Sequence, residues 1–321
     1  MTQIVHALVF SIGVLAAAIA PAQEKFSLSI GTGGTGGVYY PLGGGLANVL
    51  SKSVPGMQAT AEVTGGSVDN LKLIATGKPY IGLSMADAGQ DAYRGEGKFK
   101  GNKVPLRTLM VLYPNRMHVV SVEGTGISKF TDLKGKRVST GSPGSATEVM
   151  AFRVIEAAGL DKDRDMKRER LGVAESVNAI KDRKIDAFFW VGGLPTAAVT
   201  DIANTPGMKI KMVDHAEYVA AMNKKYGQLY TQDVIPKTTY RGMDADNHNA
   251  TVWNILVSNE NLSDKVAYDV VKTMIEKRDD LIAVHKEAAN FVLANQKASA
   301  SPIPFHAGAV KYFAEKGQKV N

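Results

Sequence analysis

A short apolar strand, a glycine-rich loop and a helix follow one another near the start of the chain, and the same order recurs twice soon afterwards. The first loop, residues 31–37, contains five glycines between the predicted strand and the predicted helix. Strands that alternate with loops and helices in this way are typical of α/β proteins with parallel strands. The sequence therefore predicts an α/β fold, whose first three strand, loop and helix units cover residues 28–52, 58–76 and 81–93.

A second set of such units begins at residues 131–140, a turn and a strand that lead into another glycine-containing loop. In that loop Ser145 and Glu148 have the spacing of a helix capping box. Two β-rich runs, residues 118–123 and 251–258, are expected to be strands that cross between the two sets. The predicted division is a signal peptide at 1–22, a discontinuous domain I at 23–120 and 255–321, and a domain II at 121–254.

The loops at the carboxyl ends of these strands are the expected ligand site, because open α/β sheets bind ligands there. Glycines let the backbone approach a ligand closely, and the helix that follows offers unpaired N–H groups to an anion. The first loop is therefore a candidate carboxylate cradle. Gly31, Gly33 and Gly36 also have G-x-G-x-x-G spacing, but the acidic residue that should end the second strand of a dinucleotide-binding unit is not where that motif requires it.

The N-terminal residues 4–20 form an apolar run without formal charge and end in small residues. Ala20-Pro21-Ala22 has the form of a signal-peptidase site, so we expect an exported protein that begins at Gln23. One feature departs from a typical signal peptide, because the segment before the apolar run contains no Lys or Arg. A periplasmic location also suits a chain without cysteine, whose stability depends on a large core and not on disulfides.

The composition argues against several other classes of protein. The net charge is +7, but the basic residues are scattered and accompany no aromatic RNA-binding signature, so no nucleic-acid partner is expected. The histidines lack zinc-site spacing, and neither a cysteine nucleophile nor a G-x-S-x-G motif is present. We therefore expect a monomeric binding protein without catalytic residues, metal or cofactor. A periplasmic α/β enzyme, or a receptor that feeds a sensor, remains the alternative.

Six motifs in a fixed order resemble the TAXI family of TRAP-transporter solute receptors. They extend over nearly all of the chain after the signal peptide: GTGGTGGVYYPLGGGLANVLSK at 31–52, TGGSVDNLKLIATGK at 64–78, DAYRGEG at 91–97, DLKGKRVSTGSPGSATEVMA at 132–151, DAFFWVGGLP at 186–195 and PFHAGAVKYFAEKG at 304–317.

The resemblance implies a type II periplasmic-binding-protein fold, with two α/β domains, two hinge strands and a ligand in the cleft. It implies that the receptor passes its solute to a TRAP-type membrane permease. The ligands associated with the family are glutamate, glutamine and 2-oxoglutarate. We therefore expect a small carboxylate of the 2-oxoglutarate or glutamate class.

One departure from the family pattern concerns the ligand. Where the family is expected to have Tyr-Pro-Glu, this chain has Tyr113-Pro114-Asn115-Arg116. Arg116 in the cleft would favour a more anionic solute, because a guanidinium binds a carboxylate bidentately. The alternative is an ordinary surface arginine at a turn.

Other candidate ligand-binding residues could likewise have a structural role instead. One of the adjacent Tyr39 and Tyr40 is expected to face the cleft, Ser67 could be a helix cap, and Asp87 could bind a ligand ammonium group or cap a helix. The complete set of expected ligand-binding residues is Thr35, Gly36, Tyr39, Tyr40, Ser67, Asn70, Asp87, Gln90, Arg116, Ser142, Ser145, Thr147, Trp190 and Gly192.

Overall fold

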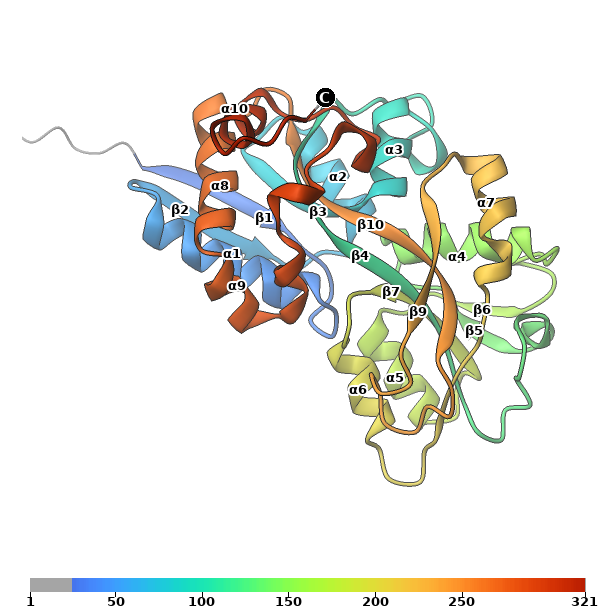
Figure 1. Cartoon of the computed structure of the whole chain (residues 1–321). Helices are drawn as coiled ribbons and strands as arrows, with labels where there is room; N and C mark the ends of the chain where they lie inside the picture. The colour runs from blue at the N-terminus through green and yellow to red at the C-terminus, as the bar shows by residue number, and fades with distance from the viewer. Residues whose placement is uncertain (1–24, 321) are drawn as a thin grey trace, which may run out of the picture.

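The computed structural model describes residues 25–320. The expected signal peptide and its cleavage site lie outside these residues. One ten-stranded sheet runs through the molecule in the order β2-β1-β3-β10-β4-β7-β5-β6, with β8 paired to β4 and β9 to β10 (Figure 1). The strands are β1 (Phe26–Gly31), β2 (Met57–Glu62), β3 (Tyr80–Met85), β4 (Leu106–Val122), β5 (Arg137–Ser139), β6 (Lys167–Glu169), β7 (Ala187–Gly192), β8 (Ile210–Met212), β9 (Tyr230–Ile235) and β10 (Asn247–Asn259).

Two long antiparallel strands, β4 and β10, connect two halves that are each built on parallel strands (Figure 1). In the first half β1 pairs in parallel with β2 and β3, and in the second β5 pairs in parallel with β6 and β7. β10 is antiparallel to β3, and β4 is antiparallel to β7. The carboxyl ends of the parallel strands in both halves therefore lead toward the region between the halves.

Strand β4 begins well before the crossing strand expected at 118–123 and continues through Pro114. Pro114 lies opposite Trp253 of β10, and the register shifts between Trp253 and Ile255. A proline has no N–H to donate to a ladder, and such irregularities are where a sheet tolerates it. The crossing segment is thus one strand of 17 residues.

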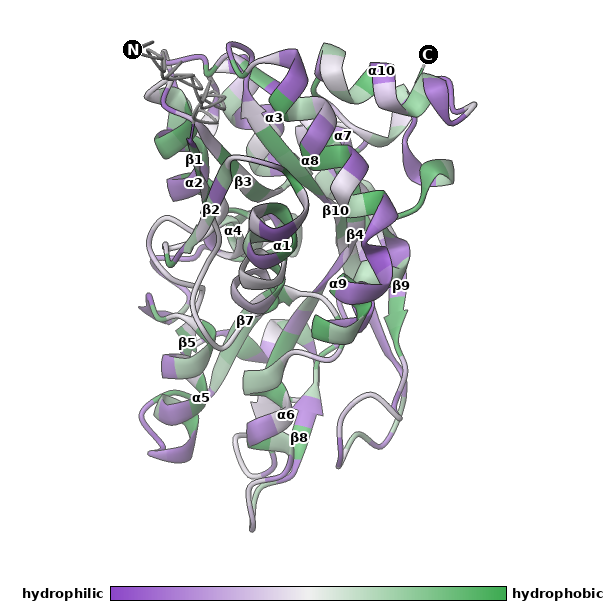
Figure 2. Cartoon of the chain, turned by 90° about the vertical axis from the view of Figure 1, so that its left-hand side faces the viewer, coloured by the Kyte–Doolittle hydropathy of each residue, from purple (hydrophilic) through white to green (hydrophobic). Residues whose placement is uncertain are grey.

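Helices cover both faces of the sheet. In Figure 2 the hydrophobic strands lie inside and the hydrophilic helix faces lie outside. α1, α8 and α10 supply one buried cluster with β1, β3 and β4, while α2, α3, α4 and α7 supply another. A third cluster joins α5 and α6 to β7 and β8. The α-helices are α1 (Tyr39–Ser53), α2 (Ser67–Ala75), α3 (Ala86–Arg94), α4 (Ala146–Ala157), α5 (Val173–Lys181), α6 (Ala197–Ala203), α7 (Val219–Tyr226), α8 (Asp264–Glu276), α9 (Arg278–Val284) and α10 (Ala307–Glu315).

The predicted helix cap at Ser145 is confirmed at the residue level, and the one suggested at Ser67 is corrected. Ser145 and Ser263 are N-caps, whose side chains accept hydrogen bonds from the N–H groups of Glu148 and Val266. Ser67, which the sequence suggested as a cap, is instead the first residue of α2. Its hydroxyl accepts a hydrogen bond from the N–H of Met85, so it fastens α2 to the end of β3.

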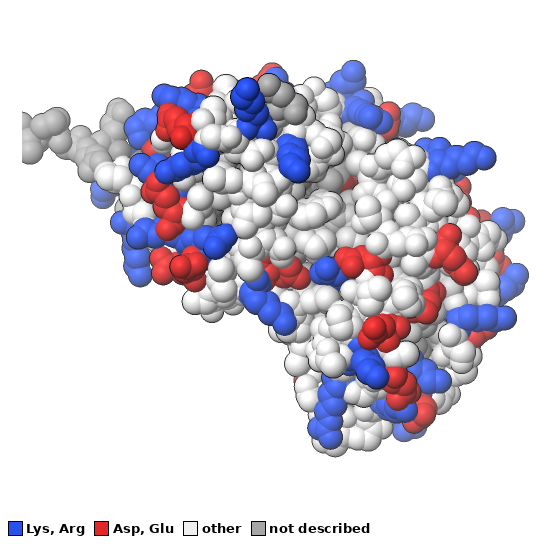
Figure 3. Space-filling view, in the orientation of Figure 1, with Lys and Arg blue, Asp and Glu red and all other residues white. Residues whose placement is uncertain are grey.

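Charged side chains of both signs surround a broad uncharged region on the face shown in Figure 3. On this face the positive net charge is not gathered into a single basic field. Among residues 25–320, no helix combines the length and the apolar character that crossing a membrane requires.

Candidate ligand-binding cleft

A cavity of about 350 Å³ lies between the two halves, where the loops after their parallel strands face each other. This volume is at the small end of the range for small-molecule sites. β4 crosses the cavity and contributes Tyr113 and Asn115. The other lining segments are the glycine loop and start of α1, residues 63–67, Met85, residues 141–147, residues 170–175 and residues 189–192.

Four helices begin at this cavity. The first residues of α1, α2, α4 and α5, namely Tyr39, Ser67, Ala146 and Val173, are all in its lining. The first N–H groups of a helix have no partner within the helix, and the helix dipole makes its N-terminus positive. The cavity is therefore suited to an anion before any charged side chain is considered.

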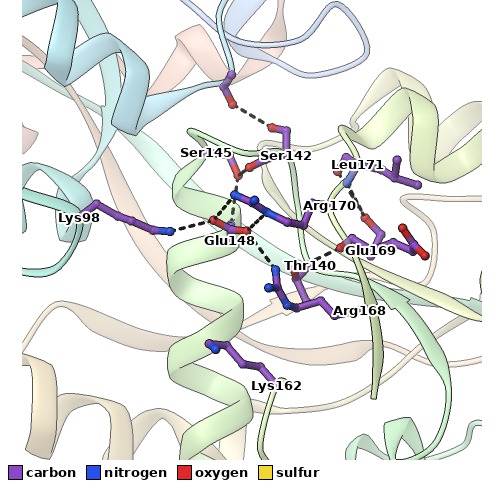
Figure 4. A network of polar contacts seen from close by, with 12 residues as sticks. Lys98, Thr140, Ser142, Ser145, Glu148, Lys162, Arg168, Glu169, Arg170 and Leu171 are labelled. Atoms are coloured by element: carbon purple, nitrogen blue, oxygen red, sulfur yellow. Dashed lines mark hydrogen bonds and ion pairs between the residues drawn. The ribbon is translucent and has the colours of Figure 1, made fainter. Parts of the chain in front are cut away.

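Arg170 adds a full positive charge at one end of this cavity. It follows β6, the edge strand of the second half, and its side chain is 46 % exposed. Its Nε donates a hydrogen bond of 2.7 Å to Oε1 of Glu148 in the first turn of α4 (Figure 4). The cavity edge also contains one acidic side chain, Glu175 of α5.

Glu148 is the centre of a cluster of basic side chains (Figure 4). Its side chain is only 1 % exposed and forms ion pairs with Lys98 at 3.1 Å, Arg168 at 3.3 Å and Arg170 at 2.7 Å. Three positive charges thus surround one negative charge, so the cluster keeps an excess of positive charge beside the α4 N-terminus. Lys98 comes from the first half and the other three residues from the second, which makes the cluster a bridge between them.

Aromatic side chains form part of the cavity wall. Tyr39, Phe189 and Trp190 line it, and the Trp190 Nε1–H donates to Thr196 Oγ1 at 2.8 Å, which fixes the indole. The Tyr39 hydroxyl donates to Oδ1 of Asn254 in β10. Burial raises the pKa of Tyr39 above its ordinary value, so this phenol stays neutral. The walls can pack against an apolar ligand body while the helix starts hold a charged group.

The halves contact each other directly around the cavity. The Ser142 hydroxyl donates to the carbonyl of Gly65 at 3.0 Å, and the N–H of Asp69 donates to the carbonyl of Gly144 at 3.1 Å. On the other side the N–H of Ala198 donates to the carbonyl of Gly36 at 3.2 Å. The structure therefore has the two halves closed against each other.

A family model described as the NMT1-like family matches residues 30–317. The chain belongs to the NMT1-like family. Three solved structures show the same fold as this NMT1-like protein. The periplasmic binding protein BugD has a TM-score of 0.55 and 13% identity, over 92% of this chain and 94% of that chain. A structure described as a periplasmic transporter has a TM-score of 0.52 and 12% identity, over 91% and 93%. A protein from Bordetella bronchiseptica RB50 has a TM-score of 0.51 and 19% identity, over 90% and 88%.

These similarities confirm the fold class that the sequence predicted. The NMT1-like chain has a two-domain α/β architecture of the type II periplasmic-binding-protein kind, with β4 and β10 as the connecting strands. At such identities the likeness concerns the fold alone, so the ligand has to be inferred from the cavity of this chain.

The structure brings many of the expected ligand-binding residues together at the cavity. Tyr39 lines it, whereas Tyr40 is not in the lining and is 39% exposed. The other expected residues in the lining are Ser67, Ser142, Ser145, Thr147, Trp190 and Gly192.

Several other expected residues lie outside the lining and have structural contacts. Asn70 is buried and donates through Nδ2 to the carbonyls of Thr32 and Leu83, so it joins the ends of β1 and β3. Gln90 donates through Nε2 to the carbonyl of Tyr226, a contact between the two halves. Thr35 and Gly36 are in the glycine loop but not in the lining.

Asp87 is also outside the lining and is neither a helix cap nor exposed to a ligand. It is fully buried and accepts a hydrogen bond of 2.8 Å from the Tyr230 hydroxyl. Arg153 of α4 lies 3.6 Å from it and also pairs with Asp91. Burial raises the pKa of Asp87, and Arg153 and Tyr230 act in the opposite direction. These residues form a buried polar contact between α3 and α4.

Arg116 is not in the cavity lining. Its Nε lies 2.8 Å from Oδ2 of Asp233, and its Nη1 lies 3.7 Å from Oε1 of Glu287. Successive side chains of a strand point to opposite faces, so Asn115 lines the cavity and Arg116 does not.

Sequence reasoning missed Arg170, Tyr113 and Asn115. Arg170 ends a run of alternating charges at 162–170, a pattern that is typical of a solvated surface, and β6 is too short to show a strand pattern. A signal was present, because Gly172 stands directly before a helix as Gly66 does. Within residues 25–320 no three His, Cys, Asp or Glu side chains are grouped to hold a metal ion.

Proposed function

We propose that this chain is an exported solute receptor that captures a small carboxylate between its two halves and delivers it to a membrane permease. The observation that supports this most directly is the convergence of four helix N-termini and Arg170 on one cavity with aromatic walls. Unpaired N–H groups and a guanidinium are the groups that bind a carboxylate best. The names of two structural relatives, a periplasmic binding protein and a periplasmic transporter, agree with this role.

The finer part of the proposal depends on the sequence resemblance. The resemblance to the TAXI family favours a TRAP-type permease as the partner, and 2-oxoglutarate, glutamate and glutamine as the first solutes to test. We place domain I at 23–120 and 255–321 and domain II at 121–254, so that each boundary falls in or beside a connecting strand. The cleft would then open and close by a hinge motion of β4 and β10.

A binding experiment tests the receptor function. Purified protein without residues 1–22 is titrated calorimetrically with small carboxylates, and the bound compound is then recovered and identified. We expect saturable binding of one molecule per chain, with the compound recovered unchanged. Chemical conversion of the compound would support the periplasmic-enzyme alternative instead.

Two further measurements test export and closure. The N-terminus of protein taken from a periplasmic extract should be Gln23, and recovery only from the cytoplasm with Met1 intact would contradict export. Solution scattering should show a smaller radius of gyration with a bound carboxylate than without one. An unchanged profile at saturation would argue against a moving cleft.

A further inference from the structure

Two buried polar groups without a partner lie at the β4 side of the cavity. Among residues 25–320, the Tyr113 hydroxyl and Oδ1 of Asn115 have no hydrogen-bond partner, and the two residues are 0% and 1% exposed. Both line the cavity and, two positions apart on β4, both face it. A buried polar group without a partner is costly, so a site that keeps two of them is built to receive a hydrogen-bonding group.

These two groups, which we call the polar floor, lie at the opposite end of the cavity from Arg170. Strand β4 and strand β6 are separated by β7 and β5. Three strand spacings place their backbones roughly 14 Å apart. One ligand can therefore present its carboxylate to Arg170 and the α4 N-terminus and a second group to the floor.

The charges beside the floor disfavour a second carboxylate. Glu287 packs next to Tyr113, since a Cβ on Gly193 would meet both side chains, at 2.7 Å and 2.9 Å. Arg116 pairs with both Glu287 and Asp233, so its one positive charge already faces two carboxyl groups and is not free for a second ligand carboxylate. Oδ1 of Asn115 is an acceptor and needs a donor. Burial, together with Tyr39 and Glu287, raises the pKa of Tyr113, so its phenol stays neutral.

We propose that the polar floor selects solutes whose second polar group is uncharged and carries a donor, a hydroxyl or an amide, and excludes dicarboxylates. This inference rests on the proposed function, because it assumes that a carboxylate binds at Arg170. It narrows the solute class that the sequence resemblance suggested and disfavours 2-oxoglutarate and glutamate.

Four probes of equal chain length test this directly by calorimetry: pentanoate, 5-hydroxypentanoate, glutaramate and glutarate. All carry a carboxylate at one end and differ only at the other. We expect 5-hydroxypentanoate and glutaramate to bind about 10- to 100-fold more tightly than pentanoate and glutarate, because only they supply a donor to the floor. Glutarate binding as tightly as glutaramate would overturn the proposal.

The variant Tyr113→Phe tests whether the polar floor causes the preference among the probes, because it removes one hydroxyl and preserves the ring. It should lower the affinity for 5-hydroxypentanoate about tenfold and leave that for pentanoate unchanged. The matched control is Tyr312→Phe, which removes another buried hydroxyl without a partner, remote from the cavity. If both variants leave the preference intact, the floor is not the selecting element.

Different outcomes would contradict the proposed function. If no probe binds, or if Arg170→Gln leaves the binding of every probe unchanged, the carboxylate site at Arg170 is wrong. If all four probes bind equally and Arg170→Gln weakens them all, the carboxylate site is right and only the floor proposal is overturned.

Discussion

The Nε of Arg170 lies 2.7 Å from Oε1 of Glu148, so the arginine at the cavity edge is held by a carboxylate that is buried in the first turn of α4. A guanidinium has five N–H groups, and this contact occupies only part of them. Because Glu148 already orients the side chain, a ligand carboxylate would immobilise little additional freedom when it binds the remaining N–H groups. In the proposed function, Glu148 would therefore act on carboxylate binding through the position of Arg170.

Arg170→Gln should weaken carboxylate binding. The variant removes a charged hydrogen-bond donor at a half-exposed position, so we expect a loss of about 1.5–3 kcal/mol in binding free energy. The measurement is calorimetric titration with 5-hydroxypentanoate. Arg164→Gln is the control, because that side chain is 83% exposed, pairs with Asp161 and is not in the cavity lining. Equal losses in both variants would indicate a general effect of charge and not a site.

Lys98→Met should shift the unliganded protein toward an open cleft. Lys98 pairs with Glu148 across the two halves at 3.1 Å, while Glu148 keeps two arginines in its own half. Since Lys98 is 45% exposed, the loss in unfolding free energy should stay within about 1 kcal/mol. The radius of gyration from solution scattering should nevertheless increase without ligand.

The control for Lys98 is Lys184→Met, which removes a 71% exposed lysine that pairs with Asp182 in the same half. This variant should leave the scattering profile unchanged. If Lys98→Met and Lys184→Met give the same profile as the parent protein, the ion pair with Glu148 does not contribute to closure.

The positions of the helix starts could be predicted from the sequence because they depend on local chemistry. Glycine loops before helices, and serine caps such as Ser145 and Ser263, act within a few residues of the element that they define. The carboxyl ends of parallel strands meet at one edge of a sheet, so these local signals suffice to predict that Tyr39, Ser142 and Thr147 lie near one another.

The remaining residues of the cavity depend on contacts between distant segments. Whether Asn115 or Arg116 faces the cavity depends on the phase of β4, which the sequence around Pro114 does not define. Asp87 and Asn70 are polar residues in the first turns of helices that follow strands, as ligand-binding residues would be, yet their partners come from distant segments. A single sequence does not show which polar residue is satisfied by the protein itself.

Gly37→Ala should reduce ligand affinity through the aromatic wall. A Cβ at this position would lie 2.7 Å from Cη2 and 3.0 Å from Cζ2 of Trp190, so the indole has to move. Overpacking of this kind typically costs about 1–3 kcal/mol of stability, and any displacement of Trp190 changes the wall of the cavity that it lines. Titration with 5-hydroxypentanoate and the change in tryptophan fluorescence measure the effect.

Gly44→Ala is the matched control for Gly37. It lies in α1, and a Cβ there would meet no atom within 4 Å. Alanine at such a position stabilises a helix by about 0.4–1 kcal/mol through the unfolded state. This variant should bind normally and unfold at a higher denaturant concentration. If Gly37→Ala behaved like Gly44→Ala, the close packing of the loop on Trp190 would not constrain the site.

Acid should destabilise the protein through two buried histidines. Burial lowers the pKa of His118 to about 3 and that of His215 to about 4, from an ordinary value of 6.5. Below pH 6.5 the unfolded chain takes up protons at these side chains and the native protein does not, so the stability present above pH 6.5 is lost as the pH falls. Each histidine contributes a slope of about 1.4 kcal/mol per pH unit.

His215→Asn isolates this effect, and urea unfolding between pH 7 and pH 4.5 measures it. The hydrogen bond of His215 Nδ1 to the carbonyl of Val213 is local, and its Nε2 has no partner among residues 25–320. The substitution also removes the packing of the imidazole near Phe130, but that loss is the same at every pH, so the slope of stability against pH isolates the titrating group. We expect the variant to lose less stability over this range than the parent, by about 1.4 kcal/mol per pH unit. The exposed His248→Asn should follow the parent curve. If His215→Asn also followed the parent curve, His215 would be protonated in the folded protein. Burial would then not lower the pKa of His215 as expected.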